Sequence, residues 1–185
     1  MSVMVTNTEG KQSFGAKYFI DATGDANLSV MCGCRYQLGR KEDNRCQPMT
    51  LCFRITNIDV DGVHKSIHDI NRLYKQYQQM GKIKNCRENV LMFRNIIENT
   101  MHFNSTSVIG CNPVDAFELS QAERTAREQM FELFDFLKTN FKCFEKSEIM
   151  MSASQIGIRE SRMIDGEYVL CGDDIRQCKK NFVTQ

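Results

Sequence analysis

The stretch YFIDATGDANLSVMCGCRY, residues 18–36, decides what fold to expect for the chain. The apolar run Tyr18–Ile20 predicts a buried strand, and residues 26–32 predict a helix that follows almost at once. A strand that passes directly into a helix leaves backbone N–H groups free at its carboxyl end, where the helix dipole favours an anion. Gly24 lets a ligand approach the backbone closely because it has no side chain.

The acid at the end of this turn narrows the possible ligands. Asp25 would repel a phosphate unless its carboxylate bonded a hydroxyl group instead, such as that of a sugar or a ribityl chain. The stretch is therefore suited to a nucleotide cofactor that carries both phosphate and polyol. The alternative is a plain helix cap, with Asp25 as the N-cap residue and Gly24 allowing the turn.

Hydrophobic periodicity predicts a mixture of strands and long helices in the rest of the chain. Strands are expected over residues 3–6, 16–20, 48–56, 90–97, 101–109, 149–158 and 162–170, and helices over 63–80 and 118–141. Ser120 and Glu123 match a capping box at the start of the second long helix. Its apolar face is expected to form core, together with the phenylalanines at 131, 134, 136 and 141.

Composition excludes several classes of protein. The chain has 185 residues, 42% of them hydrophobic, and a formal net charge of +1, which gives no electrostatic basis for binding nucleic acid or an anionic membrane. No apolar run approaches the roughly 20 residues that span a bilayer, and the start of the chain does not resemble a signal peptide. The expected location is the cytoplasm.

Nine cysteines and three histidines raise the question of a metal site. The cysteine spacing is irregular, and Cys32 and Cys34 are too close together for a zinc knuckle, so free and mostly buried thiols are expected. His64 and His68 have a spacing that can bind metal, but no third ligand is apparent, and we predict no metal site.

Four segments, in order, resemble one family. They are AKYFIDATGDANLSVMCGCRYQLGR, QPMTLCFRITNID, SQAERTAREQMFELFDFLK and ASQIGIRESRMIDGEYVLCGDDI. They are similar to segments of FAD-dependent oxidoreductases, glutathione-reductase-like flavoproteins that contain FIDATGD and GxRESRxIxGEYxL. The resemblance implies an α/β (α+β) fold, with part of a Rossmann-type FAD-binding domain and a mixed-sheet substrate domain with long helices. It implies FAD as cofactor and electron or hydride transfer between flavin and an unknown small molecule.

The same resemblance implies how the chain is divided. Residues 1–45 would be part of the FAD-binding domain, 46–150 the substrate domain, and 151–185 a truncated return segment. The chain contains no Gly-x-Gly, the motif that receives the FAD pyrophosphate in the family. The chain is therefore expected to be an interior piece of a longer flavoprotein. Its expected partners are a small-molecule substrate and the missing N-terminal and C-terminal parts, with no nucleic acid and no membrane.

The resemblance also implies the site residues. Ala22, Thr23 and Gly24 are the expected cofactor contacts, with Asp25 on a hydroxyl group. Arg159 and Arg162 are the candidate catalytic cations, although an extended backbone would point them to opposite faces.

Two observations keep other interpretations open. Glu160 shares a face with Arg162 and could hold it in a purely structural ion pair. Ala26 and Asn27 depart from the family pattern, which has glycine and aspartate there. The alternative function is a non-catalytic remnant or interaction module that binds no cofactor. A cysteine-based redox sensor is not favoured, because no resolving pair is evident.

Overall fold

The structure, a computed structural model, describes residues 2–179 and divides the chain into two compact units. The first consists of the residues up to Gln37 and those from Arg162 onward. The second is Leu38–Ser161. Helices are combined with small, largely antiparallel sheets, so the expected α+β class is confirmed.

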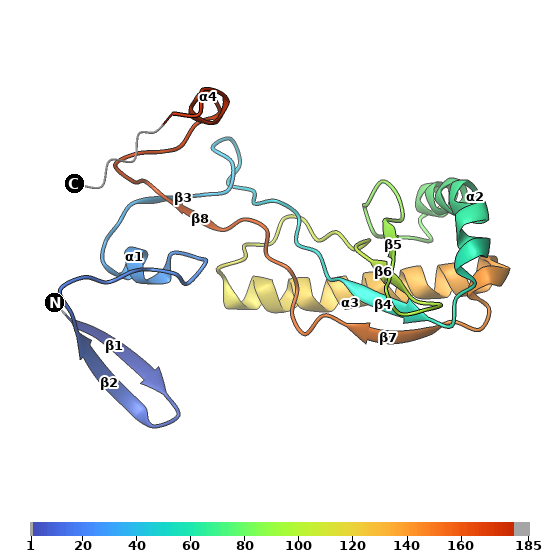
Figure 1. Ribbon diagram of the computed structural model, residues 1–185, viewed down its shortest axis with the longest axis horizontal. Helices are drawn as coiled ribbons and strands as arrows, with labels where there is room; N and C mark the ends of the chain where they lie inside the picture. Colours follow the sequence, from blue (N-terminus) through green and yellow to red (C-terminus); the bar gives the residue numbers. More distant parts are fainter. Residues whose placement is uncertain (1, 180–185) are drawn as a thin grey trace. The chain divides into compact units, whose positions relative to one another are not determined.

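A four-stranded antiparallel sheet with the order β5-β6-β4-β7 forms the centre of the second unit (Figure 1). Its strands are β4 (Phe53–Thr56), β5 (Met92–Arg94), β6 (Met101–Phe103) and β7 (Glu148–Ser152). Phe53 pairs with Phe103 on one side and with Ser152 on the other. The register with β7 shifts between Arg54 and Ile55. The sheet buries the alternate residues of β4 and β6, as expected where one face packs on a core.

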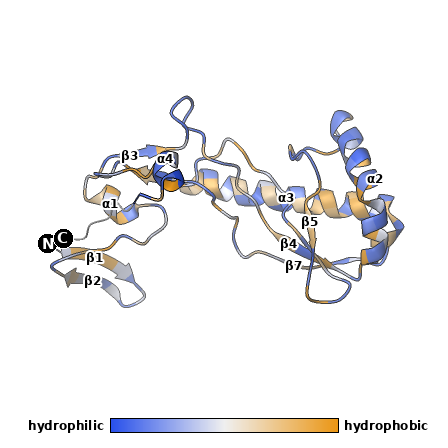
Figure 2. Cartoon of the chain, turned by 45° about the horizontal axis from the view of Figure 1, so that its top comes forward, coloured by the Kyte–Doolittle hydropathy of each residue, from blue (hydrophilic) through white to orange (hydrophobic). Residues whose placement is uncertain are grey.

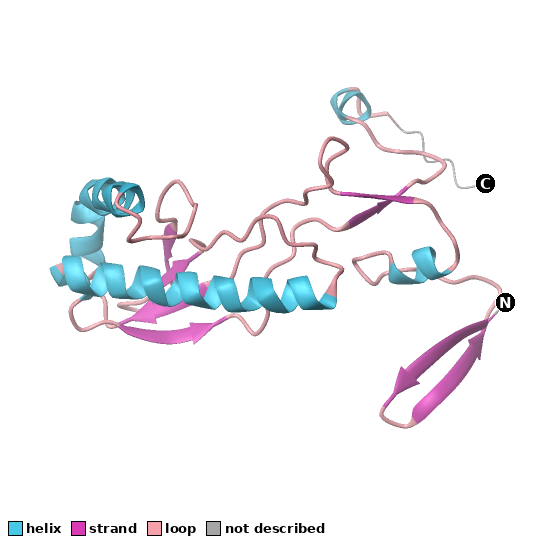
Figure 3. Cartoon of the chain, turned by 180° about the vertical axis from the view of Figure 1, so that it is seen from behind, coloured by secondary structure: helices cyan, strands magenta, loops and turns pink. Residues whose placement is uncertain are grey.

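Two long helices accompany this sheet, α2 (Val60–Gln79) and α3 (Ala116–Asn140), followed by a short 3-10 turn, η1 (Lys142–Phe144). Figure 3 shows α3 lying along one face of the sheet. The periodicity of the sequence predicted both helices to within a few residues. The predicted capping box of Ser120 and Glu123 was wrong, because α3 begins four residues before Ser120. The carboxylate of Asp115 caps the first amides of the helix instead.

The apolar core lies entirely within the second unit. Its largest fully buried side chains are Tyr74, Phe53, Phe103, Phe144, Met49, Leu51, Ile55, Ile58, Ile70, Met101, Leu133 and Leu137. Each such side chain stabilises the fold by roughly 1.5–3 kcal/mol relative to exposure. The predicted face of α3 is buried at Ala122, Ala126 and Met130, but Phe131 was wrongly placed in the core and is exposed.

Side-chain hydrogen bonds extend the sheet where regular pairing stops. Thr106 Oγ1 accepts from Leu51 N at 2.7 Å and donates to Leu51 O at 3.1 Å. The Gln129 side-chain amide, from α3, pairs in the same way with both backbone groups of Ser107, at 2.8 and 3.0 Å. These bonds satisfy buried backbone groups of Leu51 and Ser107 with side chains in place of a backbone partner. They also explain why the strands predicted over 48–56 and 101–109 are shorter than expected.

The first unit is built from short elements. They are the hairpin of β1 (Ser2–Asn7) and β2 (Gly10–Gly15), α1 (Asn27–Met31), the pair β3 (Tyr36–Leu38) and β8 (Arg162–Ile164), and α4 (Gly172–Arg176). No apolar side chain among its described residues is buried, although β1 and α1 are visibly hydrophobic in Figure 2. This unit therefore lacks a core of its own within the described part of the chain.

The strand predicted at residues 16–20 was wrong. The second strand of the hairpin is instead the more polar β2, and it turns back from β1 through two residues, Thr8 and Glu9. Tyr18 and Ile20 are 88% and 90% exposed, and no described strand pairs with their segment. An apolar run forms a buried strand only where neighbouring strands pair with it, and within residues 2–179 none does.

Candidate functional site

The loop between Ile20 and α1 is organised by Asp21. One carboxylate oxygen accepts from Thr23 N and Oγ1, at 3.1 and 2.7 Å. The other accepts from Ser29 N and Oγ, at 2.8 and 2.7 Å. These hydrogen bonds, with that from the Ser29 amide first, hold the pKa of Asp21 well below its usual range. A fixed negative charge therefore ties the turn to the helix.

Several of the backbone N–H groups near the predicted anion site form hydrogen bonds within the chain. Thr23 Oγ1 accepts from Asn27 N at 2.9 Å, and Asp21 takes the amide of Ser29. The alternative that Asp25 is the helix cap was wrong, because the N-cap residue is Ala26, in the left-handed conformation at φ 55°, with no side-chain cap. The five-residue α1 is therefore anchored from outside by Asp21 and Thr23.

The structure brings Arg162 onto this same loop. Its NH1 donates to Asp25 O at 3.2 Å and to Asn27 Oδ1 at 2.8 Å, across more than 130 residues of sequence. The guanidinium also lies 5.5 Å from the centre of the Tyr36 ring, a cation–π contact. Two of the predicted site segments thus meet, through a contact that the sequence could not reveal.

The expected structural ion pair of Glu160 with Arg162 does not form. Glu160 Oε2 instead accepts from the backbone N–H of Gln47 at 2.7 Å. Arg159, the other predicted cation, belongs to the second unit, where its side chain is exposed.

Two polar groups of this loop have no hydrogen-bond partner among the described residues. Arg162 Nε is buried and unpartnered, which is costly for a charged donor. The Asp25 carboxylate makes no hydrogen bond or ion pair within residues 2–179, and Gly24, at φ 84°, has open space where a Cβ would stand. A cation with a spare donor, a carboxylate acceptor and an open glycine fit a ligand that has both anionic and hydroxyl groups.

A hollow of about 360 Å³ lies beside the loop in the first unit. It is lined by Ser2, Val3, Lys17, Tyr18, Phe19, Asp21, Leu28, Ser29, Cys32 and Cys34. Its volume is within the usual range for small-molecule pockets, roughly 300–1,000 Å³. The predicted contacts Ala22, Thr23 and Gly24 are exposed on the loop and are not among its lining residues.

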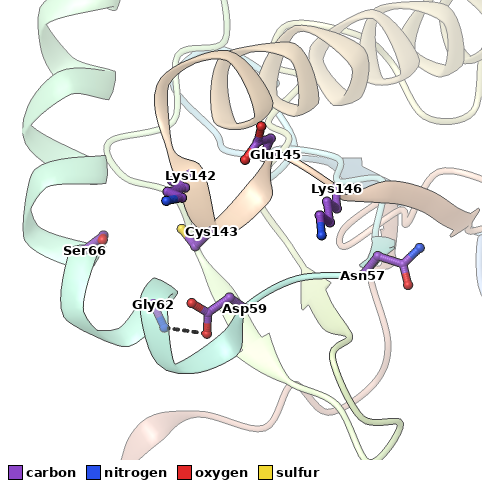
Figure 4. A pocket seen from close by; sticks show the side chains of 8 residues that line it. All are labelled: Asn57, Asp59, Gly62, Ser66, Lys142, Cys143, Glu145 and Lys146. Atoms are coloured by element: carbon purple, nitrogen blue, oxygen red, sulfur yellow. Dashed lines mark hydrogen bonds between the residues drawn. The ribbon is translucent and has the colours of Figure 1, made fainter.

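The second unit has separate cavities. One, of about 380 Å³, lies between the start of α2 and the turn at Lys142–Lys146. Figure 4 shows its lining residues, with the hydrogen bond that Asp59 accepts from the amide of Gly62; its length is 3.0 Å. Burial raises the pKa of the Cys143 thiol in its wall. Another, of about 290 Å³, lies where Gln47 meets Glu160. None of the predicted site residues lines either cavity.

The remaining predictions concern thiols, metals and membranes. The cysteines are free, but the expectation that most are buried was wrong, because each is exposed or partly exposed. Within residues 2–179 no group of three His, Cys, Asp or Glu side chains could hold a metal ion. No helix in that range is both long and apolar enough to cross a bilayer.

Comparison with known proteins gives one match. The chain matches the family model of the FAD dependent oxidoreductases over residues 1–183. No curated protein and no solved structure matches it. A match over nearly the whole length agrees with the FIDATGD-like and RESR-like segments at its two ends. The chain therefore belongs to the FAD-dependent oxidoreductase family, whose cofactor is FAD.

Proposed function

We propose that the chain is an interior part of an FAD-dependent oxidoreductase in which the first unit holds part of the FAD. Transfer of electrons between the flavin and a small-molecule substrate is the proposed reaction. The observation that carries the proposal is Arg162, which joins the loop at Asp25 while its buried Nε has no partner. Family membership supports FAD as the cofactor. The contacts of Arg162 support the loop at Asp25 as the part of the chain that binds it.

Each residue of the loop has a proposed role. Arg162 supplies a fixed positive charge, because a guanidinium stays protonated and donates in a rigid fork. Asp25 accepts a hydrogen bond from a hydroxyl of the cofactor. The backbone of Ala22, Thr23 and Gly24 lies against the cofactor. Asp21 orients this turn without contacting the ligand. Bound FAD supplies the redox chemistry itself, while the protein positions and tunes it. Arg159 stays a candidate for the substrate side.

The first unit also supports the proposal that more polypeptide belongs to the protein. It buries no described apolar side chain, and Met31 in α1 is 85% exposed. A unit of this kind needs further chain to cover it, since apolar burial is the main stabilising contribution to a fold. We propose that the first unit, up to Gln37 and from Arg162 onward, belongs to the FAD-binding domain and that the second unit, Leu38–Ser161, is the substrate domain. The sequence had placed these boundaries at residues 45 and 150. The cytoplasm stays the proposed location.

The second candidate is a non-catalytic remnant that binds no cofactor. The observation that favours it is the internal use of the amides of Asn27 and Ser29, which an anionic ligand would otherwise take. On this alternative, Arg162 serves only to join β8 to the loop.

Substitution of Arg162 separates the two candidates. In the complete flavoprotein, Arg162→Ala is expected to weaken FAD binding about 10- to 100-fold, the equivalent of losing one hydrogen bond to a charged group. Arg35→Ala is the matched control, because Arg35 belongs to the same unit but forms only an exposed ion pair with Asp165 at 2.9 Å. FAD affinity is measured by fluorescence titration of the apoprotein. Equal affinities in the two variants would contradict the proposed role.

A further inference from the structure

Two cysteines lie on either side of the glycine that ends α1. The amide of Cys34 donates to Ser29 O at 3.0 Å, and that of Gly33 donates to Val30 O at 2.9 Å. This is the Schellman pattern that closes a helix on a left-handed residue, and Gly33 has φ 87°. The chain therefore turns sharply between Cys32 and Cys34, and two hydrogen bonds fix that turn.

Both cysteines border the same hollow. Cys32 and Cys34 are exposed, and both line the hollow of about 360 Å³ in the first unit. Each of the two second-unit cavities described above has a single cysteine in its wall, Cys143 in one and Cys46 in the other. The shared hollow gives a small reagent access to both thiols of the pair.

Five of the other seven thiols of the described chain are less suited to reaction, whereas Cys171 and Cys178 are exposed. Burial raises the pKa of the four partly buried ones, which keeps them protonated and weakly nucleophilic. They are Cys46, Cys52, Cys111 and Cys143. Cys86 is exposed, but its thiol is directed to Ser107 O at 3.7 Å.

We propose that Cys32 and Cys34 form a reversible dithiol–disulfide couple whose substrates are low-molecular-weight disulfides such as glutathione disulfide. One cysteine thiolate attacks a substrate sulfur, so a mixed disulfide forms and one glutathione thiolate leaves. The second cysteine thiolate then attacks the protein sulfur of that mixed disulfide and releases the second glutathione. The protein loses two electrons and two protons, and the substrate becomes two thiols.

The tight spacing makes the couple labile rather than structural. Two cysteines separated by one residue can close a ring only where the backbone turns, and the turn at Gly33 supplies that geometry. An exposed or strained disulfide is more easily reduced than a structural one. The couple should therefore switch with the ratio of reduced to oxidised glutathione instead of staying closed.

Peptide mapping tests the couple directly. Trypsin cleaves after Lys17 and Arg35, and the peptide between them contains Cys32 and Cys34 and no other cysteine. The complete native protein is equilibrated in glutathione buffers of different ratios, quenched with acid, alkylated and digested. We expect this peptide to pass reversibly from the doubly alkylated form to an unalkylated form that is lighter than the reduced peptide by two hydrogen atoms. A peptide that stays doubly alkylated, or that carries glutathione adducts, would overturn the proposal.

Three controls show whether the fold is responsible. The oxidised fraction should be larger in the complete native protein than in urea at the same glutathione ratio, and an equal or smaller native fraction also overturns the proposal. Cys32→Ser should trap a glutathione adduct on Cys34. Gly33→Ala should lower the oxidised fraction, because alanine is strained at this φ. None of these measurements involves FAD, so their failure would leave the proposed oxidoreductase function unaffected.

Discussion

The phenol of Tyr74 offers the sharpest test of the core of the second unit. Its side chain is 1% exposed and packs edge-on against Phe136, with ring centres 5.8 Å apart. Its hydroxyl has no hydrogen-bond partner among the described residues. Burying an unpaired hydroxyl costs about 1–3 kcal/mol. Tyr74→Phe removes only that oxygen, so we expect the free energy of unfolding to rise by about 1 kcal/mol.

Tyr77 on the same helix is the matched control. It packs against the same ring, at 5.1 Å, but its hydroxyl donates to Asn140 Oδ1 at 3.0 Å. Tyr77→Phe loses this bond and is expected to lower the free energy of unfolding by about 0.5–1.5 kcal/mol. The same substitution should therefore change stability in opposite directions at two positions one helical turn apart.

Urea unfolding followed by far-ultraviolet circular dichroism measures both changes. The signal comes mainly from α2 and α3, and the chain contains no tryptophan for a fluorescence measurement. The midpoints can be compared only if the free energy of unfolding depends equally steeply on urea concentration in all three proteins. If Tyr74→Phe lowered stability as much as Tyr77→Phe does, the Tyr74 hydroxyl would have a partner and this account of the core would be wrong.

Three further predictions concern the same residues and the candidate site. Burial raises the pKa of Tyr74 in the folded state. The stability that depends on a neutral phenol is therefore complete below about pH 10 and is lost as the pH rises further. The free energy of unfolding of Tyr74→Phe should fall less steeply with pH in alkali than that of the parent, as measured by urea unfolding at a series of pH values. Gln129→Leu leaves both backbone groups of Ser107 unpaired and should cost about 2–6 kcal/mol, whereas the exposed Glu128→Leu should cost little; equal urea midpoints would contradict this. Asp21→Asn should speed hydrogen exchange of the Ser29 amide, as measured by nuclear magnetic resonance, and unchanged exchange would show that Asp21 does not hold the loop.

Local patterns predicted the elements that depend on local forces. The face of α3 at Ala122 and Ala126 follows from helical periodicity alone, and so do the approximate limits of both long helices. The cap of α3 was misplaced because Ser120 and Glu123 fit a capping box as well as Asp115 fits a simple cap. Tertiary contacts settled the choice, since Glu123 accepts from the backbone of Ile156 at 2.6 Å.

The candidate site depended on contacts that no local pattern encodes. The sequence indicated the residues from Ala22 to Asp25 and named Arg162, but it could not show that Arg162 reaches the Asp25 carbonyl. It also missed Asp21 as the organiser of the loop. The available signal was an aspartate placed two residues before a threonine, the spacing of a local side-chain turn. Because Asp21 follows the apolar run Tyr18–Ile20, the sequence pattern predicted the end of a buried strand there instead.

The FAD content of the protein tests the central claim most directly. The chain is expressed together with its adjoining sequence, purified, and examined by visible absorption, with the 185-residue chain alone in parallel. We predict a yellow protein with the flavin band near ~450 nm and about one FAD per complete chain, and a colourless short chain that lacks the pyrophosphate-binding loop. A complete protein that stays colourless and fails to bind added FAD would contradict the account.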